Sequence, residues 1–123
     1  MITIKDLSFA LLTSWDADTA KGEWRPDVPS LNQCAVTALV VQDYFGGDLL
    51  RCPLNDGDSH YWNKIADGNE IDLTFEQFSY THQFDEEGKT IVRERDYVLS
   101  YPDTLKRYEI LAKRVRSVLT RKD

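Results

Sequence analysis

The chain has 123 residues, of which 41% are hydrophobic, and its net charge is −6. This length is typical of one domain, and the apolar content excludes a disordered chain because it is sufficient to build a core. The acidic balance disfavours nucleic acid as a partner, since a phosphate backbone attracts basic proteins. No apolar run approaches the length of a membrane span. We therefore expect a single domain over residues 1–123 and no association with a membrane.

The charge is unevenly distributed. Residues 102–123 carry seven Lys or Arg and only three Asp or Glu, whereas the rest of the chain is strongly acidic. We interpret the basic side chains as the solvated face of a terminal helix, with a surface for an acidic partner as the alternative. Two cysteines and no recognisable export signal fit the reducing cytoplasm, where we expect the protein to reside.

The first half of the chain predicts a helix, a loop and a second helix. Residues 6–15 have apolar side chains at helical spacing, and residues 16–30 contain glycine, proline and many charges, as loops do. From Ala35 to Phe45 only three residues are polar, so we expect a helix that is buried on nearly every side. Gly46-Gly47 then predicts its end.

The start of that second helix has two possible caps. Ser30 and Gln33 fit the S-x-x-Q capping box, and Asn32 is a competing cap. Either choice places Cys34 in the first helical turn.

The second half of the chain predicts a small sheet and a last helix. We expect strands over residues 48–54, 60–65 and 71–75, an irregular stretch over 76–90, a strand or extended segment over 91–100, and a helix over 102–121. The predicted fold is α+β. A buried central helix packs on a small antiparallel sheet, with helices from the N- and C-terminal parts of the chain on its flanks.

Cys34, His60 and Asp72 have the chemistry of a catalytic triad. A thiolate at a helix start is stabilised by the helix and by a neighbouring imidazolium, so Cys34 is the candidate nucleophile. His60 would transfer the proton, and Asp72 would hold its ring in one tautomer. The backbone N–H of Cys34 would bind the developing oxyanion, and Gln33 or Asn32 is the candidate second donor.

The turn between the second and third strands decides whether this triad can form. Side chains alternate between the two faces of a strand. A two-residue turn at Asp67-Gly68 would therefore place His60 and Asp72 on opposite faces, and only an odd turn or a bulge brings them together.

The order of these motifs resembles two protein groups. "QCAVTALVVQD", "GG", "HYWN" and "IDLTFEQF" resemble the YunG-like family of small bacterial proteins, and "SWDADT" and "DTLKRYEIL" extend the resemblance over most of the chain. The same order is similar to the transglutaminase-like and NlpC-type branches of the papain-like cysteine peptidase fold. The transglutaminase pattern H-x-W … D-x-T is matched here by residues 60–62 and 72–74, which begin at His60 and at Asp72. The resemblance implies a papain-like core with Cys34, His60 and Asp72 as nucleophile, base and orienting acid.

The function that we expect is cysteine-dependent hydrolysis or acyl transfer on an amide, including isopeptide or deamidation chemistry. Trp62, Tyr61 and Trp24 are the candidate walls of its substrate cleft. This chemistry needs no cofactor. The sequence does not identify the amide-containing substrate or the protein partner, and it does not give the oligomeric state. The alternative is a catalytically inactive papain-like binding or regulatory module. A third hypothesis is a subunit or a toxin-antitoxin-type partner that acts through the basic terminal helix.

A zinc site is the rival use of the same residues. Cys34, Cys52, His60 and His82 would be its ligands, but neither paired cysteine nor paired histidine spacing is present. We therefore expect no metal, and we expect Cys52 to be a structural residue.

Overall fold

The computed structural model describes residues 1–54, 59–74 and 90–121, which form helices around one antiparallel sheet. The elements in chain order are α1 (Ile4–Ser14), α2 (Cys34–Phe45), β1 (Asp48–Pro53), β2 (Ser59–Lys64), β3 (Glu70–Ile71), β4 (Ile91–Arg93), α3 (Arg95–Leu99) and α4 (Pro102–Thr120). The strand order is β3-β2-β1-β4. The predicted α+β class is confirmed, and the irregular stretch predicted over 76–90 lies, apart from its last residue, outside the described residues.

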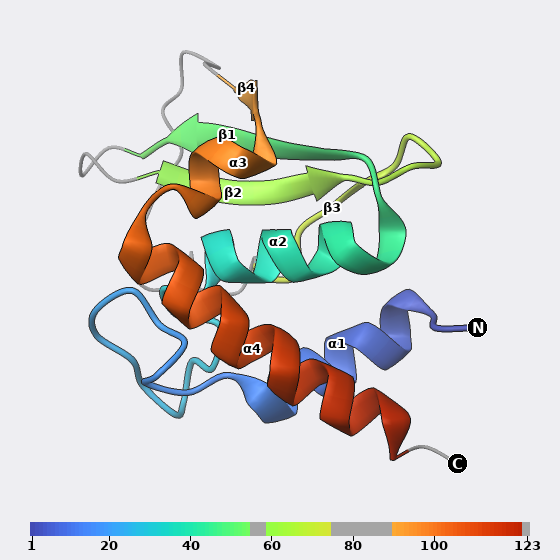
Figure 1. Cartoon of the computed structure of the whole chain (residues 1–123), viewed down its shortest axis with the longest axis vertical. Coiled ribbons are helices and arrows are strands. Elements are labelled where there is room, and N and C mark those ends of the chain that lie inside the picture. The colour runs from blue at the N-terminus through green and yellow to red at the C-terminus, as the bar shows by residue number, and fades with distance from the viewer. Residues whose placement is uncertain (55–58, 75–89, 122–123) are drawn as a thin grey trace.

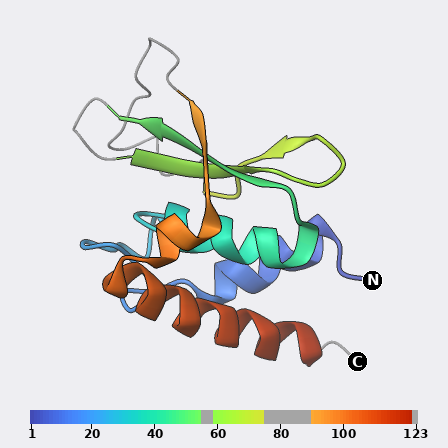
Figure 2. The same cartoon turned by 45° about the horizontal axis from the view of Figure 1, so that its top comes forward.

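Helix α2 is the central layer of the molecule. The sheet lies on one side of it, and α4 and α1 lie on the other (Figures 1 and 2). Buried side chains of α2 therefore join two clusters, one with α1 and α4 and one with the sheet and α3. This explains why α2 is apolar all round, and the predicted buried central helix is confirmed. The buried residues of α2 are Val36, Thr37, Ala38, Leu39, Val40 and Val41.

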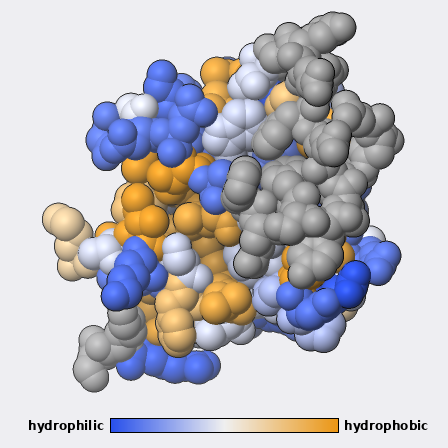
Figure 3. All heavy atoms as spheres, turned by 180° about the vertical axis from the view of Figure 1, so that it is seen from behind, coloured by the Kyte–Doolittle hydropathy of each residue, from blue (hydrophilic) through white to orange (hydrophobic). Residues whose placement is uncertain are grey.

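Helix α1 is covered on one side only. Leu7 and Leu11 are fully buried, whereas Phe9 and Leu12 are 56% and 50% exposed. Hydrophobic side chains form a broad area on the back of the molecule (Figure 3). Within the described residues, no helix combines the length and apolarity that crossing a bilayer requires.

The start of α2 differs from the predicted caps. Gln33 occupies the N-cap position without a side-chain capping bond, so neither the Ser30–Gln33 box nor an Asn32 cap forms. Asn32 adopts a left-handed backbone with φ 60°, and its amide donates to the Glu23 carbonyl at 2.7 Å. The prediction that Cys34 lies in the first turn is confirmed, because it is the first residue of α2.

The turn between β2 and β3 contains three residues. Asn63 pairs with Ile71 and Lys64 with Glu70, and the Ile65 N–H donates to the Asn69 carbonyl. Residues 66–68 form the turn, with Gly68 at φ 92°, a left-handed conformation that favours glycine. If this pairing is continued by one residue, Asp72 lies opposite Trp62. Trp62 and His60 are two positions apart on β2 and share a face, so Asp72 lies on the same face as His60.

Two predicted strands differ from the structure by more than one residue at an end. The third predicted strand ends at Ile71 because the Thr74 N–H donates to the Asp72 side chain, which folds the chain into a turn. The segment predicted as extended over 91–100 is a strand for only three residues and then becomes helix α3.

Two arginines of α4 hold the loop that leads to Cys34. Arg107 is only 6% exposed, and it pairs with Asp103 and donates to the Thr19 carbonyl. Arg114 pairs with Asp16 at 2.8 Å and donates to the Ser14 carbonyl. For these two residues the predicted solvated face is wrong, because each bonds backbone carbonyls across the molecule.

Candidate active site

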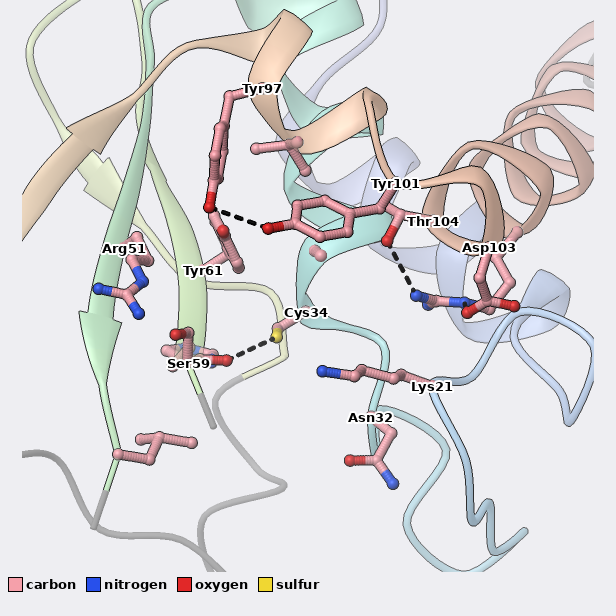
Figure 4. A pocket seen from close by; sticks show the side chains of 15 residues that line it. Lys21, Asn32, Cys34, Arg51, Ser59, Tyr61, Tyr97, Tyr101, Asp103 and Thr104 are labelled. Atoms are coloured by element: carbon pink, nitrogen blue, oxygen red, sulfur yellow. Dashed lines mark hydrogen bonds and ion pairs between the residues drawn. The ribbon is translucent and has the colours of Figure 1, made fainter. Parts of the chain in front are cut away.

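Cys34 lies where α2 meets the sheet. Its backbone N–H, like the others in a first helical turn, has no acceptor inside the helix and lies at the positive end of the helix dipole. The thiol is half-buried and contacts the Ser59 carbonyl at 3.8 Å, at the start of β2 (Figure 4). Because β2 begins beside this turn, the side chain of its second residue is within reach of Cys34.

That second residue is His60, which is 1% exposed. Its Nε2 lies 2.6 Å from Oδ2 of Asp72. Burial lowers the pKa of His60, but hydrogen bonds with Asp72 and with the Cys34 thiol, together with the charges of both groups, raise it to about 9. Because Asp72 engages Nε2, Nδ1 is the ring nitrogen left for Cys34. The imidazole is therefore protonated at neutral pH and lies between a thiol and a carboxylate.

Asp72 is held by the residue two positions after it. Its Oδ1 accepts hydrogen bonds from the backbone N–H of Thr74 at 3.0 Å and from the Thr74 hydroxyl at 3.1 Å. This leaves Oδ2 directed at His60. Thr74 is 1% exposed, and its orienting role was not predicted. The D-x-T spacing carries the signal, since short polar side chains commonly close such local turns.

Trp62 supports the ring of His60. The two rings stack with centroids 5.6 Å apart and an angle of 17° between their planes. The indole N–H of Trp62 donates to Glu70 at 2.9 Å, which holds the indole against the sheet. Trp62 does not line the cavity described next, so it contacts the site through His60.

A cavity of about 370 Å³ opens onto Cys34 and His60 (Figure 4). It lies between the sheet, the start of α2, and α3 with the first turn of α4. Tyr61 and Asn32 line it, as predicted for Tyr61, whereas Trp24 does not and instead donates to the Pro29 carbonyl at 3.0 Å. Its other lining residues are Lys21, Ala35, Arg51, Leu54, Ser59, Tyr97, Val98, Tyr101, Asp103, Thr104 and Arg107.

Most of these lining residues were not predicted. Arg51, Tyr97 and Tyr101 come from β1, α3 and the residue before α4, and no local motif links them. These residues have in common only that they surround one cavity. The spacing of residues along the sequence does not reveal that arrangement.

A comparison with known protein families identifies the family of this chain. The family model described as "YunG protein" matches residues 3–120. The chain belongs to the YunG family. It is similar to "Uncharacterized protein YunG" of Bacillus subtilis (strain 168), with 37% identity over 75 residues, which is 61% of this chain and 63% of that protein. The match thus spans less than two thirds of that relative's length. No solved structure gives a significant match.

The two candidate oxyanion donors of this YunG family member differ in position. Asn32 lines the cavity, whereas Gln33 is fully buried and donates through Nε2 to the Asp16 carbonyl at 3.0 Å. Among the described residues, Oε1 of Gln33 has no hydrogen-bond partner. Gln33 thus ties the start of α2 to the preceding loop, and Asn32 is the one of the two that borders the space beside Cys34.

The rival metal site is only partly within the described structure. Cys52 pairs with His60 across β1 and β2, is 3% exposed, and directs its thiol at the Pro53 carbonyl at 3.5 Å. Over residues 1–54, 59–74 and 90–121, no three His, Cys, Asp or Glu side chains are placed to share a metal ion. His82 lies outside these residues.

Proposed function

We propose that this YunG family member is a cysteine-dependent hydrolase or acyltransferase that acts on an amide or a related carbonyl. The observation that carries the proposal is the contact of one imidazole with two groups. The Asp72 carboxylate lies 2.6 Å from His60, and the Cys34 thiol is near enough to raise the pKa of the same imidazole, beside a cavity that opens onto Cys34. A nucleophile, a proton carrier and an orienting acid close together, with access for a substrate, are the parts that thiol acyl chemistry requires.

The reaction follows from the protonation of His60. With a pKa of about 9, the ring carries a proton at neutral pH, and the nucleophile of the proposed reaction is the Cys34 thiolate beside this imidazolium. The Cys34 sulfur attacks the carbonyl carbon, and the oxyanion is stabilised by the Cys34 backbone N–H. His60 then gives its proton to the leaving amine, and a thioester remains. Water or a second amine attacks the thioester, His60 takes the proton of that nucleophile, and the thiolate is released beside the imidazolium.

The order of the elements supports a papain-like core of the transglutaminase-like kind as part of this proposal. The cysteine begins a helix that packs on an antiparallel sheet, the histidine is on a strand of that sheet, and the acid follows the next strand. Cys34, His60 and Asp72 also keep the motif spacing on which the resemblance rests.

A binding or regulatory module without turnover is the second candidate. It is favoured by the side-chain amides of Asn32 and Gln33, which donate to the Glu23 and Asp16 carbonyls. An oxyanion hole ordinarily uses two donors, and the loss of one costs about 100- to 1000-fold in rate. A cavity with a single donor would bind a carbonyl ligand without turning it over efficiently.

The rate of Cys34 alkylation by iodoacetamide, measured across a range of pH, tests the enzyme proposal. An ion-paired thiolate keeps a high rate below neutral pH, and His60→Ala removes the imidazolium and should slow labelling at pH 6–7 by about tenfold or more. Cys52, counted separately by peptide mass spectrometry, is the internal control because it is buried. A Cys34 rate that follows that of a free cysteine peptide at every pH, with no effect of His60→Ala, contradicts the proposal.

A further inference from the structure

We propose that the substrate of this site carries an anionic group, a carboxylate or a phosphate, which Arg51 binds beside the carbonyl that Cys34 attacks. The inference rests on the proposed function, because it names the substrate class of the same cavity.

The charge of the cavity wall is opposite to that of the chain. Lys21, Arg51 and Arg107 line the cavity, and Asp103 is the one carboxylate among its described lining residues. The chain as a whole has a net charge of −6. Arg107 pairs with Asp103 at 2.8 Å, so the charge of Asp103 is balanced and Arg51 adds positive charge to the wall. A concave, positive wall on an acidic protein concentrates anions at that place.

Arg51 is positioned as a ligand-binding side chain. It lies on β1, opposite Tyr61 of β2, and it forms part of the cavity wall (Figure 4). The side chain is half-buried, and within the described parts of the chain its guanidinium forms no ion pair and no hydrogen bond. A partly desolvated arginine gains most from a bidentate contact with a carboxylate or a phosphate.

Tyrosine hydroxyls extend this polar wall. The hydroxyls of Tyr97 and Tyr101 hydrogen-bond each other at 3.0 Å, and Tyr61 lies beside them (Figure 4). Burial raises the pKa of Tyr61, and the charge of Arg51, its cross-strand partner, acts to lower it. An anion on Arg51 therefore has neutral hydroxyl donors nearby, and no carboxylate of the described lining lies next to it.

The arrangement also sets where the anion lies relative to the reacting carbon. Arg51 and Ser59 form one wall of the cavity, Lys21 and Asn32 form the opposite wall, and Cys34 lies between them (Figure 4). Because the Cys34 sulfur contacts the Ser59 carbonyl, it lies nearer the wall that holds Arg51. The anionic group that Arg51 binds is thus close to the acyl carbon of the same substrate. Acidic amino-acid residues and short diacids have this arrangement.

A pair of alkylating probes tests this inference without knowledge of the natural substrate. Iodoacetate and iodoacetamide are similar in size and differ in charge, so the ratio of their rates at Cys34 reports the local field. The wild type should favour iodoacetate more than a free cysteine peptide does. Arg51→Gln should lower the ratio by about 3- to 10-fold, and this effect should shrink at high salt. Arg51→Lys should keep most of the ratio.

The control variant is Arg116→Gln, which removes the same charge from an exposed position of α4 that does not line the cavity. Its ratio should equal that of the wild type. An equal ratio in the wild type and in Arg51→Gln, with both variants folded by circular dichroism, overturns the inference. The iodoacetamide rate alone reports thiol activation, so a failure of the proposed function is seen separately from a failure of the anion site.

Protection against iodoacetamide distinguishes the two kinds of anion. Acetate and inorganic phosphate are added at constant ionic strength to the wild type and to Arg51→Gln. Stronger protection of the wild type by either anion supports the site and assigns it to a carboxylate or to a phosphate. Equal protection of the wild type and of Arg51→Gln by both anions argues against an anion site at Arg51.

Discussion

His60 and Asp72 lie on the same side of the sheet because the turn between β2 and β3 has three residues. Their Nε2 and Oδ2 atoms are 2.6 Å apart, although the residues are twelve positions apart in the chain. A turn of two residues would shift the pairing by one position and place Asp72 on the other face. The length of one short turn therefore decides whether the buried imidazole has a carboxylate partner.

Loss of that carboxylate should lower the pKa of His60. Asp72→Asn removes one of the groups that raise the pKa to about 9, so the value should fall toward the ordinary 6.5. NMR titration of the imidazole checks this, and His82→Gln assigns the signals because the chain has only two histidines. An unchanged titration in Asp72→Asn would show that the ion pair does not control the ring.

The raised pKa of His60 also makes stability depend on pH. The folded value is above the unfolded value, so the stabilisation is fully present below pH 6.5 and is lost as the pH rises through about 9. The upper limit of the loss is roughly 3–4 kcal/mol, because each tenfold change in proton affinity corresponds to roughly 1.4 kcal/mol. Urea unfolding of the wild type should show this decline, and His60→Gln should be much flatter over the same range. Parallel pH profiles of the two proteins would contradict the prediction.

Thr74 should act as a positioning residue for Asp72. Thr74→Val removes the hydroxyl that donates to Oδ1 and keeps the shape of the side chain, whereas Thr74→Ser keeps the hydroxyl. We expect Thr74→Val to lose about 1 kcal/mol of stability and to lower the pKa of His60, because the carboxylate is less well oriented. Thr74→Ser should restore the histidine titration. If both variants titrate like the wild type, the hydroxyl has no positioning role.

Arg107 should stabilise the loop before Cys34. Arg107→Ala removes the partner of Asp103 and leaves the Thr19 carbonyl without its donor, at a cost of about 1–3 kcal/mol. Lys106→Ala is the matched control, because Lys106 is exposed on the same turn of α4. Denaturant unfolding measures both. Equal stability of the two variants would mean that Arg107 is an ordinary surface cation.

Local patterns were sufficient for the parts of the fold that depend on burial. The apolar run from Ala35 to Phe45 predicted a helix covered on all sides, and the structure places α2 between the sheet and two other helices. The helix start was predicted within one turn, although the predicted caps were wrong. The side chains of Asn32 and Gln33 bond the loop over 16–30 instead, and that contact depends on tertiary structure.

The sequence by itself determined the order of α1, α2, the first three strands and α4, the burial of α2 and the place of Cys34 in a first helical turn, since these follow from hydrophobic periodicity and from residues adjacent in the chain. Only the tertiary structure decided the face of Asp72, the contact of His60 with Cys34 and the cavity lined by Arg51. The register across β2 and β3 is set by a three-residue turn that ends in the left-handed Gly68, and the cavity is built by segments that meet only after folding.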